Sequence, residues 1–177
     1  MQRLAFLFLI SSICFSACEP LPAQYFDEDG NPLPHIYRIS ANDVHKIRFR
    51  MLDSINVLRQ ARGSHLLVID EHLTAAAATH SRDISSQNRA WHFGSDGSSP
   101  FIRVARAKFT GTLLGELIAE TYEAELHVLA VWLTDKESRA ILLDNQATRM
   151  GFAWHQERNG KIWWTLITGK YDTSMVE

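Results

Sequence analysis

Two ionisable residues, His92 and Glu116, lie in stretches of sequence where they are candidates for acid–base chemistry or metal binding. His92 opens the turn-rich segment HFGSDGSSPFIR, and Glu116 interrupts the apolar run LLGELIAET. Histidine exchanges a proton near neutral pH, and a carboxylate beside it can serve as the other half of a general acid–base pair. Both residue types can also bind a metal ion. The surrounding elements decide whether the two side chains meet.

The common catalytic motifs are absent from the chain. It has no HExxH, GxSxG, P-loop or CxxC pattern, so the corresponding hydrolase, nucleotide-binding and redox sites are not indicated. His72 and His80 are eight residues apart, about 12 Å along a helix, which is too far to share one metal ion. His80 lies on an apolar helix stripe, where we expect a buried, hydrogen-bonded histidine.

Three helices are predicted in the first half of the domain. Apolar residues at three-and-four spacing predict the first helix after Asp43. Ser99, followed by proline, predicts the N-cap of a short third helix. The second helix begins at an Asp70 N-cap, and its predicted buried face consists of Leu73, Ala76, Ala77, His80 and Ile84. The segment opened by His92 therefore connects the second helix to the third.

The second half of the chain predicts strands and two more helices. LLGELIAET is expected to form a central strand or a strand that leads into a loop, and residues 124–143 are expected to form two helical pieces broken near Asp135 to Glu137. The Asn159-Gly160 pair predicts a hairpin between two aromatic-rich strands. Because helices come first and a hairpin comes last, the predicted fold class is α+β.

The composition indicates one globular domain. Of the 177 residues, 46% are hydrophobic and 21% are charged. The net charge is −2, and no basic block could follow a phosphate backbone, so nucleic acid is not an expected partner. We expect a monomer.

The N-terminus predicts export and anchoring. Residues 1–17 contain Arg3, an apolar stretch and small residues, which is typical of a signal peptide. The following Cys18 completes a stretch that resembles a bacterial lipobox, so we expect it to be acylated and to anchor the chain in a membrane of the cell envelope, facing the periplasm or the outside. The alternative is an ordinary secretory signal cut after Ala23. Prolines in residues 18–42 predict a tether, followed by a folded domain at 43–171 and a C-terminal tail at 172–177.

Seven stretches follow one another along the chain: LDSINVLRQARG, LVIDEHLTAAAATHSRDI, HFGSDGSSPFIR, GELIAE, AVWLTDKESRAILL, RMGFAW and WWTLITG. Their order resembles the CAP superfamily, the SCP-like domain of cysteine-rich secretory, antigen-5 and pathogenesis-related proteins, in its short bacterial form. The resemblance implies a three-layer α-β-α sandwich with a small, mainly antiparallel sheet. It also implies a cleft lined by two histidines and two acidic residues, in which His92 and Glu116 meet.

Ser138 stands where the resemblance implies the second cleft histidine, and Asp135 or Glu137 could supply the second acid. One imidazole and two carboxylates would then remain. Because a tight zinc site needs three or four well-placed ligands, we expect no required cofactor and only weak binding of a divalent cation. The candidate cleft residues are therefore His92, Glu116, Asp135, Glu137 and Ser138.

Two functions remain open. The first is a non-catalytic, envelope-tethered binding module for a lipid, glycan or peptide. The second is a hydrolase in which His92 and Glu116 form a general acid–base pair, with or without a metal. The replacement of the second histidine by Ser138 favours the binding module.

Overall fold

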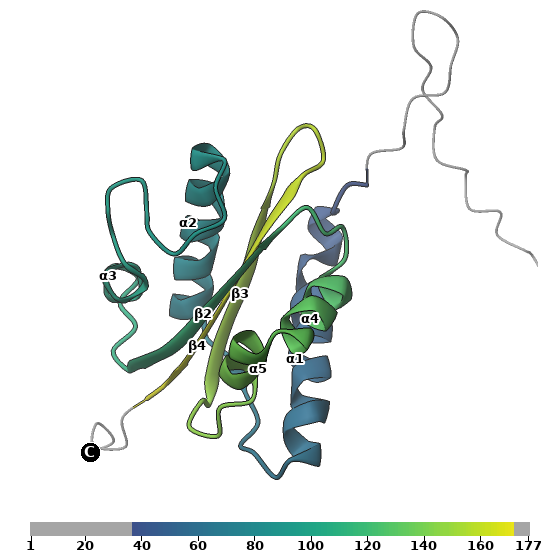
Figure 1. Cartoon of the computed structure of the whole chain (residues 1–177), viewed down its shortest axis with the longest axis vertical. Helices are drawn as coiled ribbons and strands as arrows, with labels where there is room; N and C mark the ends of the chain where they lie inside the picture. Colours follow the sequence, from purple (N-terminus) through teal and green to yellow (C-terminus); the bar gives the residue numbers. More distant parts are fainter. Residues whose placement is uncertain (1–36, 172–177) are drawn as a thin grey trace, which may run out of the picture. The chain divides into compact units, whose positions relative to one another are not determined.

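The computed structural model describes residues 37–171, which form a sheet with helices on both faces (Figure 1). The predicted signal peptide, Cys18 with most of the tether, and the predicted tail lie outside these residues. The predicted α+β class and α-β-α sandwich are confirmed. In chain order the elements are η1 Ala41–Asp43, α1 Val44–Ala61, β1 Val68–Ile69, α2 Glu71–Gln87, α3 Pro100–Arg106, β2 Thr112–Glu120, α4 Glu125–Thr134, α5 Lys136–Leu142, β3 Arg149–Gln156 and β4 Ile162–Lys170.

The four strands lie in the order β1-β3-β4-β2. The β1–β3 pair is parallel, while β3–β4 and β4–β2 are antiparallel, so the sheet is mainly antiparallel as predicted. Of the two alternatives for LLGELIAET, the central strand is wrong, because within residues 37–171 β2 pairs only with β4 and forms one edge. The other alternative is confirmed, since β2 leads into the loop at residues 121–124. The β3–β4 hairpin occupies the centre, because β3 also pairs with β1 and β4 also pairs with β2. Glu116 therefore lies on an edge strand.

On one face of the sheet, α1, α4 and α5 cover a large apolar core (Figure 1). Seventeen buried apolar residues of the described chain form this core, among them Trp132, Phe152 and Trp164. The rings of Phe152 and Trp164 stack with their centroids 5.6 Å apart. The Trp132 indole donates a hydrogen bond to the Ile118 carbonyl at 3.2 Å, so the buried ring leaves no unsatisfied donor.

On the opposite face, α2 and the shorter α3 cover the sheet (Figure 1). Within residues 37–171 the apolar cluster on this face has seven buried residues, three of them alanines, and Ile84 of α2 and Trp163 of β4 are also fully buried. Gly151 of β3 permits this close packing, because a Cβ atom at that position would lie 2.1 Å from the backbone carbon of Leu73 in α2. The predicted cap of α2 is confirmed: Asp70 Oδ1 accepts from the Leu73 N–H at 3.0 Å.

The folded domain begins earlier than the predicted boundary at residue 43. The Gln156 side chain, at the end of β3, donates to the Tyr37 carbonyl at 2.8 Å and accepts from the Ile39 N–H at 3.0 Å. Residues 37–42, which the sequence predicted as part of the tether, are therefore attached to the sheet. The sequence missed this attachment because it depends on a glutamine more than 100 positions away, not on local composition.

Candidate functional site

Glu116 is the centre of a buried network of charged and polar side chains. Its side chain is 2% exposed, and Arg103 of α3 holds both carboxylate oxygens at 2.8 Å. His92 Nδ1 lies 3.0 Å from Glu116 Oε1, and His80 Nε2 of α2 lies 3.6 Å from the same oxygen. The structure thus brings His92 and Glu116 together, and adds an arginine and a second histidine.

Arg103 also fixes the loop that carries His92. Its guanidinium donates to the His92 carbonyl and to the Ser98 carbonyl, both at 2.9 Å, while the side chain is only 4% exposed. Gly97, with φ of +75°, makes a turn that a residue with a side chain would adopt only under strain. The loop is therefore held at both ends by the same arginine that binds Glu116.

Asp96 reinforces this loop from its tip. Its carboxylate accepts from the Ser98 N–H at 2.9 Å and pairs with Arg106 of α3 at 2.5 Å. Hydrogen bonds from Ser98, followed by the bond from Arg106, hold the pKa of Asp96 well below its ordinary value. Asp96 is consequently ionised across the physiological range.

His80 is fully buried, as its place on the apolar stripe of α2 predicted. Its Nε2 atom also lies 3.0 Å from the Trp91 carbonyl, so the expected hydrogen bond is confirmed. Burial lowers the pKa of His80, although the charge of Glu116 opposes this effect. The imidazole is therefore neutral at neutral pH, and it acts as a packed polar group rather than as a cation paired with Glu116.

Asp135, Glu137 and Ser138 are not part of this network. Asp135 is the N-cap of α5, and its carboxylate accepts from the Ser138 N–H at 2.8 Å, which lowers the pKa of Asp135. Helix α5 packs on the other face of the sheet, since a Cβ atom on Gly115 would meet Ile141, whereas the next residue, Glu116, contacts α2 and α3. The expectation that these three residues line one cleft with His92 is corrected.

Sequence reasoning missed Arg103 and placed His80 only in the core. Arginine is a residue type that usually faces solvent, so its type and position gave no sign of a buried partner. The available signal was Glu116 itself, because a carboxylate inside an apolar strand requires a buried cation or hydrogen-bond donors.

The network does not fit a metal ion. Arg103 faces both oxygens of Glu116, and a metal would have to displace this guanidinium. Across residues 37–171 no group of three or more His, Cys, Asp or Glu side chains has an arrangement that could hold a metal. Two imidazoles and one occupied carboxylate fall short of the free ligands that a tight zinc site uses.

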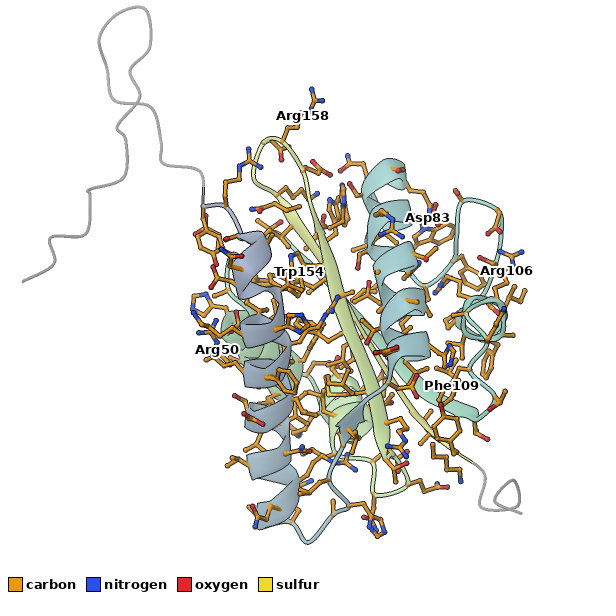
Figure 2. All side chains as sticks on the ribbon, turned by 180° about the vertical axis from the view of Figure 1, so that it is seen from behind. Arg50, Asp83, Arg106, Phe109, Trp154 and Arg158 are labelled. Atoms are coloured by element: carbon orange, nitrogen blue, oxygen red, sulfur yellow. The ribbon has the colours of Figure 1, made fainter. Side chains whose placement is uncertain are left out.

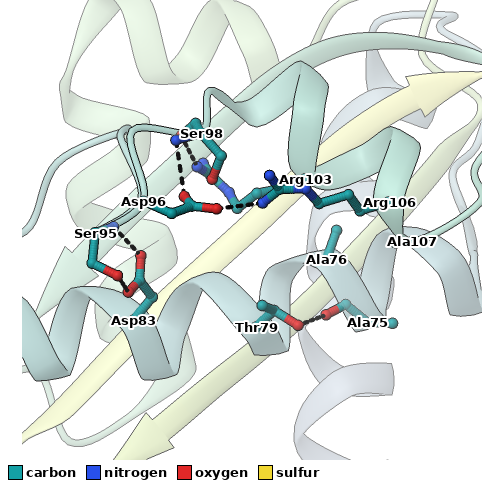
Figure 3. A pocket seen from close by; sticks show the side chains of 10 residues that line it. All are labelled: Ala75, Ala76, Thr79, Asp83, Ser95, Asp96, Ser98, Arg103, Arg106 and Ala107. Carbon is teal, nitrogen blue, oxygen red and sulfur yellow. Dashed lines mark hydrogen bonds and ion pairs between the residues drawn. The ribbon is translucent and has the colours of Figure 1, made fainter.

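A pocket of about 380 Å³ lies beside the network, between α2 and α3 (Figure 3). This volume is within the range of about 300–1,000 Å³ that is usual for small-ligand sites. One side of the pocket is a stripe of α2, and the other consists of α3 and the tip of the loop that carries His92. The lining residues are Ala75, Ala76, Thr79, Asp83, Ser95, Asp96, Ser98, Arg103, Arg106 and Ala107.

The sandwich and its motif order define the class of the protein. The model of the CAP, or cysteine-rich secretory protein, family matches residues 52–168, and the chain belongs to this family. It is 26% identical over 121 residues to the uncharacterized protein YkwD of Bacillus subtilis (strain 168). That match covers 68% of this chain but 46% of YkwD, so the chain spans about half the length of this relative.

Solved structures with the same fold come from several bacteria. An outer surface protein of Borrelia burgdorferi superimposes with a TM-score of 0.67 at 17% identity, over 78% of this chain and 100% of that one. An extracellular SCP-domain protein of Bacillus anthracis gives a TM-score of 0.63 at 23% identity, over 76% of this chain and 45% of its own. At sequence identities of 17% and 23%, the structural similarity establishes the fold alone. None of the helices within residues 37–171 is long and apolar enough to cross a membrane.

Proposed function

We propose that this chain is an exported, envelope-tethered CAP protein that works as a non-catalytic binding module. The observation that carries this proposal is the pair formed by Arg103 with both oxygens of Glu116. For Glu116 to accept a substrate proton or bind a metal, part of this buried ion pair must break, and breaking a buried pair costs about 3–5 kcal/mol. Glu116 is better suited to hold the loop and α3 in place than to react.

The N-terminal sequence and the relatives support export. Residues 1–17 have the pattern of a signal peptide and precede Cys18. The relatives of known structure include proteins described as an outer surface protein and an extracellular protein. A lipid chain on Cys18 would keep the domain at a membrane surface, where a pocket between helices could meet a lipid, glycan or peptide ligand.

A hydrolase is the second candidate, and one observation favours it. The His92 side chain is 51% exposed and is oriented by Glu116 through Nδ1, as a general base is oriented by a carboxylate in catalytic dyads. Against this reading, Arg103 compensates the charge of Glu116. The only cysteines, Cys14 and Cys18, lie in the N-terminal segment, so the domain has no thiol nucleophile.

An activity screen separates the two candidates. The purified full chain is incubated with fluorogenic peptide, ester and glycoside substrates, with and without zinc. We expect no turnover above the buffer blank. Hydrolysis by the wild type that disappears in His92→Ala but persists in His127→Ala, an exposed histidine on α4, would overturn the binding-module proposal.

Palmitate labelling in cells tests the tether. The wild type and Cys14→Ser should incorporate the label, because Cys14 lies within the segment that is removed, whereas Cys18→Ser should not. Equal labelling of Cys18→Ser and the wild type, or no labelling of any of the three, would contradict lipid anchoring.

A further inference from the structure

We propose that the pocket between α2 and α3 binds a primary ammonium group on an aliphatic stem, such as the side chain of a lysine in a peptide. The inference rests on the proposed binding role and adds the ligand chemistry. It depends on the charge balance of the pocket, on the separation of its acidic and apolar ends, and on the position of Asp83.

Asp83 is a carboxylate without a cationic partner among residues 37–171. It accepts from the Ser95 N–H at 2.8 Å, the Ser95 hydroxyl at 2.6 Å and the Gln87 amide at 3.1 Å. These neutral donors fix the orientation of the carboxylate but leave its charge uncompensated. In Figure 2, Asp83 and Arg106 are both seen on the side of the sheet covered by α2 and α3.

The other charges around the pocket compensate one another. Arg103 is paired with Glu116 behind the wall, and Arg106 is paired with Asp96 at the rim. Three carboxylates therefore face two guanidinium groups, and the remaining negative charge belongs to Asp83. Because a charge in a concave site attracts its opposite more strongly than one on an open surface, the pocket favours a cation.

The shape of the pocket selects the kind of cation. Ala75, Thr79 and Asp83 follow one another at four-residue intervals on α2, so they form a single stripe. Ala75 and Asp83 are about 12 Å apart along the axis at 1.5 Å per residue. Ala107, the C-cap of α3, lies at the alanine end, since its carbonyl is 2.9 Å from Nδ1 of His72, near the start of α2.

The two ends of the pocket thus differ in polarity. Alanine side chains surround one end, and the Asp83 carboxylate lies at the other (Figure 3). An extended lysine side chain presents a four-carbon stem to apolar surface and an ammonium group with three donors to an acceptor. A lysine with its ammonium group at Asp83 would lay its stem over Thr79, and the peptide to which it belongs would extend over the alanines.

The probe pair that tests this inference is Nα-acetyl-lysine methylamide and Nα-acetyl-norleucine methylamide, which differ only by the ammonium group. Each is titrated into the 15N-labelled full chain, and amide shifts are followed by NMR. We expect the lysine probe to bind at least tenfold more tightly than the norleucine probe, with the largest shifts in residues 75–83 and 95–107. Salt should reduce this preference because it screens the ion pair.

Three variants locate the effect. Asp83→Asn keeps the shape of the side chain and should abolish the preference for lysine. Ala75→Leu fills the apolar end and should weaken both probes while leaving the bonds of Asp83 intact. Asp53→Asn, a matched change on the exposed face of α1, should bind as the wild type does.

Equal affinity of the wild type for the two probes, absence of binding by either, or a preference that survives in Asp83→Asn would overturn the inference. None of these results depends on His92 or Glu116. Failure here is therefore distinguishable from failure of the proposed function, which would appear as hydrolysis that depends on His92.

Discussion

The two faces of the sheet are built by different physical means. Within residues 37–171, the apolar cluster under α1, α4 and α5 has seventeen buried residues with stacked aromatic rings. The apolar cluster under α2 and α3 has seven, and the same face carries the buried Glu116 network. Truncating a buried apolar side chain destabilises the fold roughly in proportion to the volume removed, because the truncation leaves a cavity. A buried charge network instead depends on every charged member having its partner. The first face stabilises the domain, and the second positions a loop and a pocket.

The apolar face should show the largest effect of a single substitution. Trp132 is 3% exposed in this core. Trp132→Ala should lower the free energy of unfolding by about 3–5 kcal/mol because it creates a cavity. Glu123→Ala, at an exposed position, should change it by less than about 0.5 kcal/mol. Urea midpoints of the two variants measure the difference, and similar midpoints would show that α4 does not pack as described.

The network face should respond differently when its partners are removed singly or together. Arg103→Met leaves Glu116 buried and unpaired, so it should cost about 3 kcal/mol. Adding Glu116→Met removes the second charge, and the double variant should recover much of this loss. The same urea titrations give the coupling between the two positions. If the losses of stability from the two single substitutions simply add in the double variant, the ion pair between Arg103 and Glu116 does not contribute to stability.

A smaller effect should appear in the dependence of stability on pH. Burial lowers the pKa of His80 in the folded chain relative to the unfolded chain, where histidine titrates near about 6.5. The unfolded state then binds more protons in acid, so the stability contributed by His80 is complete above that pH and is lost as the pH falls from there through the lower pKa of the folded chain. His80→Gln should flatten the decline in urea midpoint between about pH 7 and pH 5. A decline as steep as that of the wild type would exclude this role for His80.

Ser138→His should have the smallest effect. The residue lies in the first turn of α5, on the face of the sheet opposite Glu116, so an imidazole there cannot join His92. Zinc affinity should stay within about twofold of the wild type, less than about 0.5 kcal/mol on the affinity relation. A tenfold gain measured by calorimetry would place Ser138 beside His92 after all.

Elements set by local chemistry were predictable from the sequence. The Asp70 cap, the buried face of α2, the break between α4 and α5 and the β3–β4 hairpin each depend on residues a few positions apart. The order of the strands was not predictable, because pairing between distant strands leaves no local signal, and the sequence therefore could not decide between a central position for β2 and a strand that leads into a loop.

The candidate site was predictable only in part, for the same reason. His92 and Glu116 were named from their unusual settings, but motif order along a chain does not reveal which face of a sheet a helix covers. That is why Ser138 and its neighbours were assigned to the wrong side. Arg103 was not predicted as a site residue, because its burial results from pairing with Glu116, thirteen positions away in β2.

Calorimetric titration of zinc into the wild type and His92→Ala at pH 7.5 tests most directly whether the Glu116 network is structural rather than catalytic. Because Arg103 holds both oxygens of Glu116, we expect the two proteins to give the same isotherm, with no site tighter than about 1 μM, or about −8 kcal/mol. A tight site in the wild type that is lost in His92→Ala would contradict the structural role and favour a metal-dependent hydrolase.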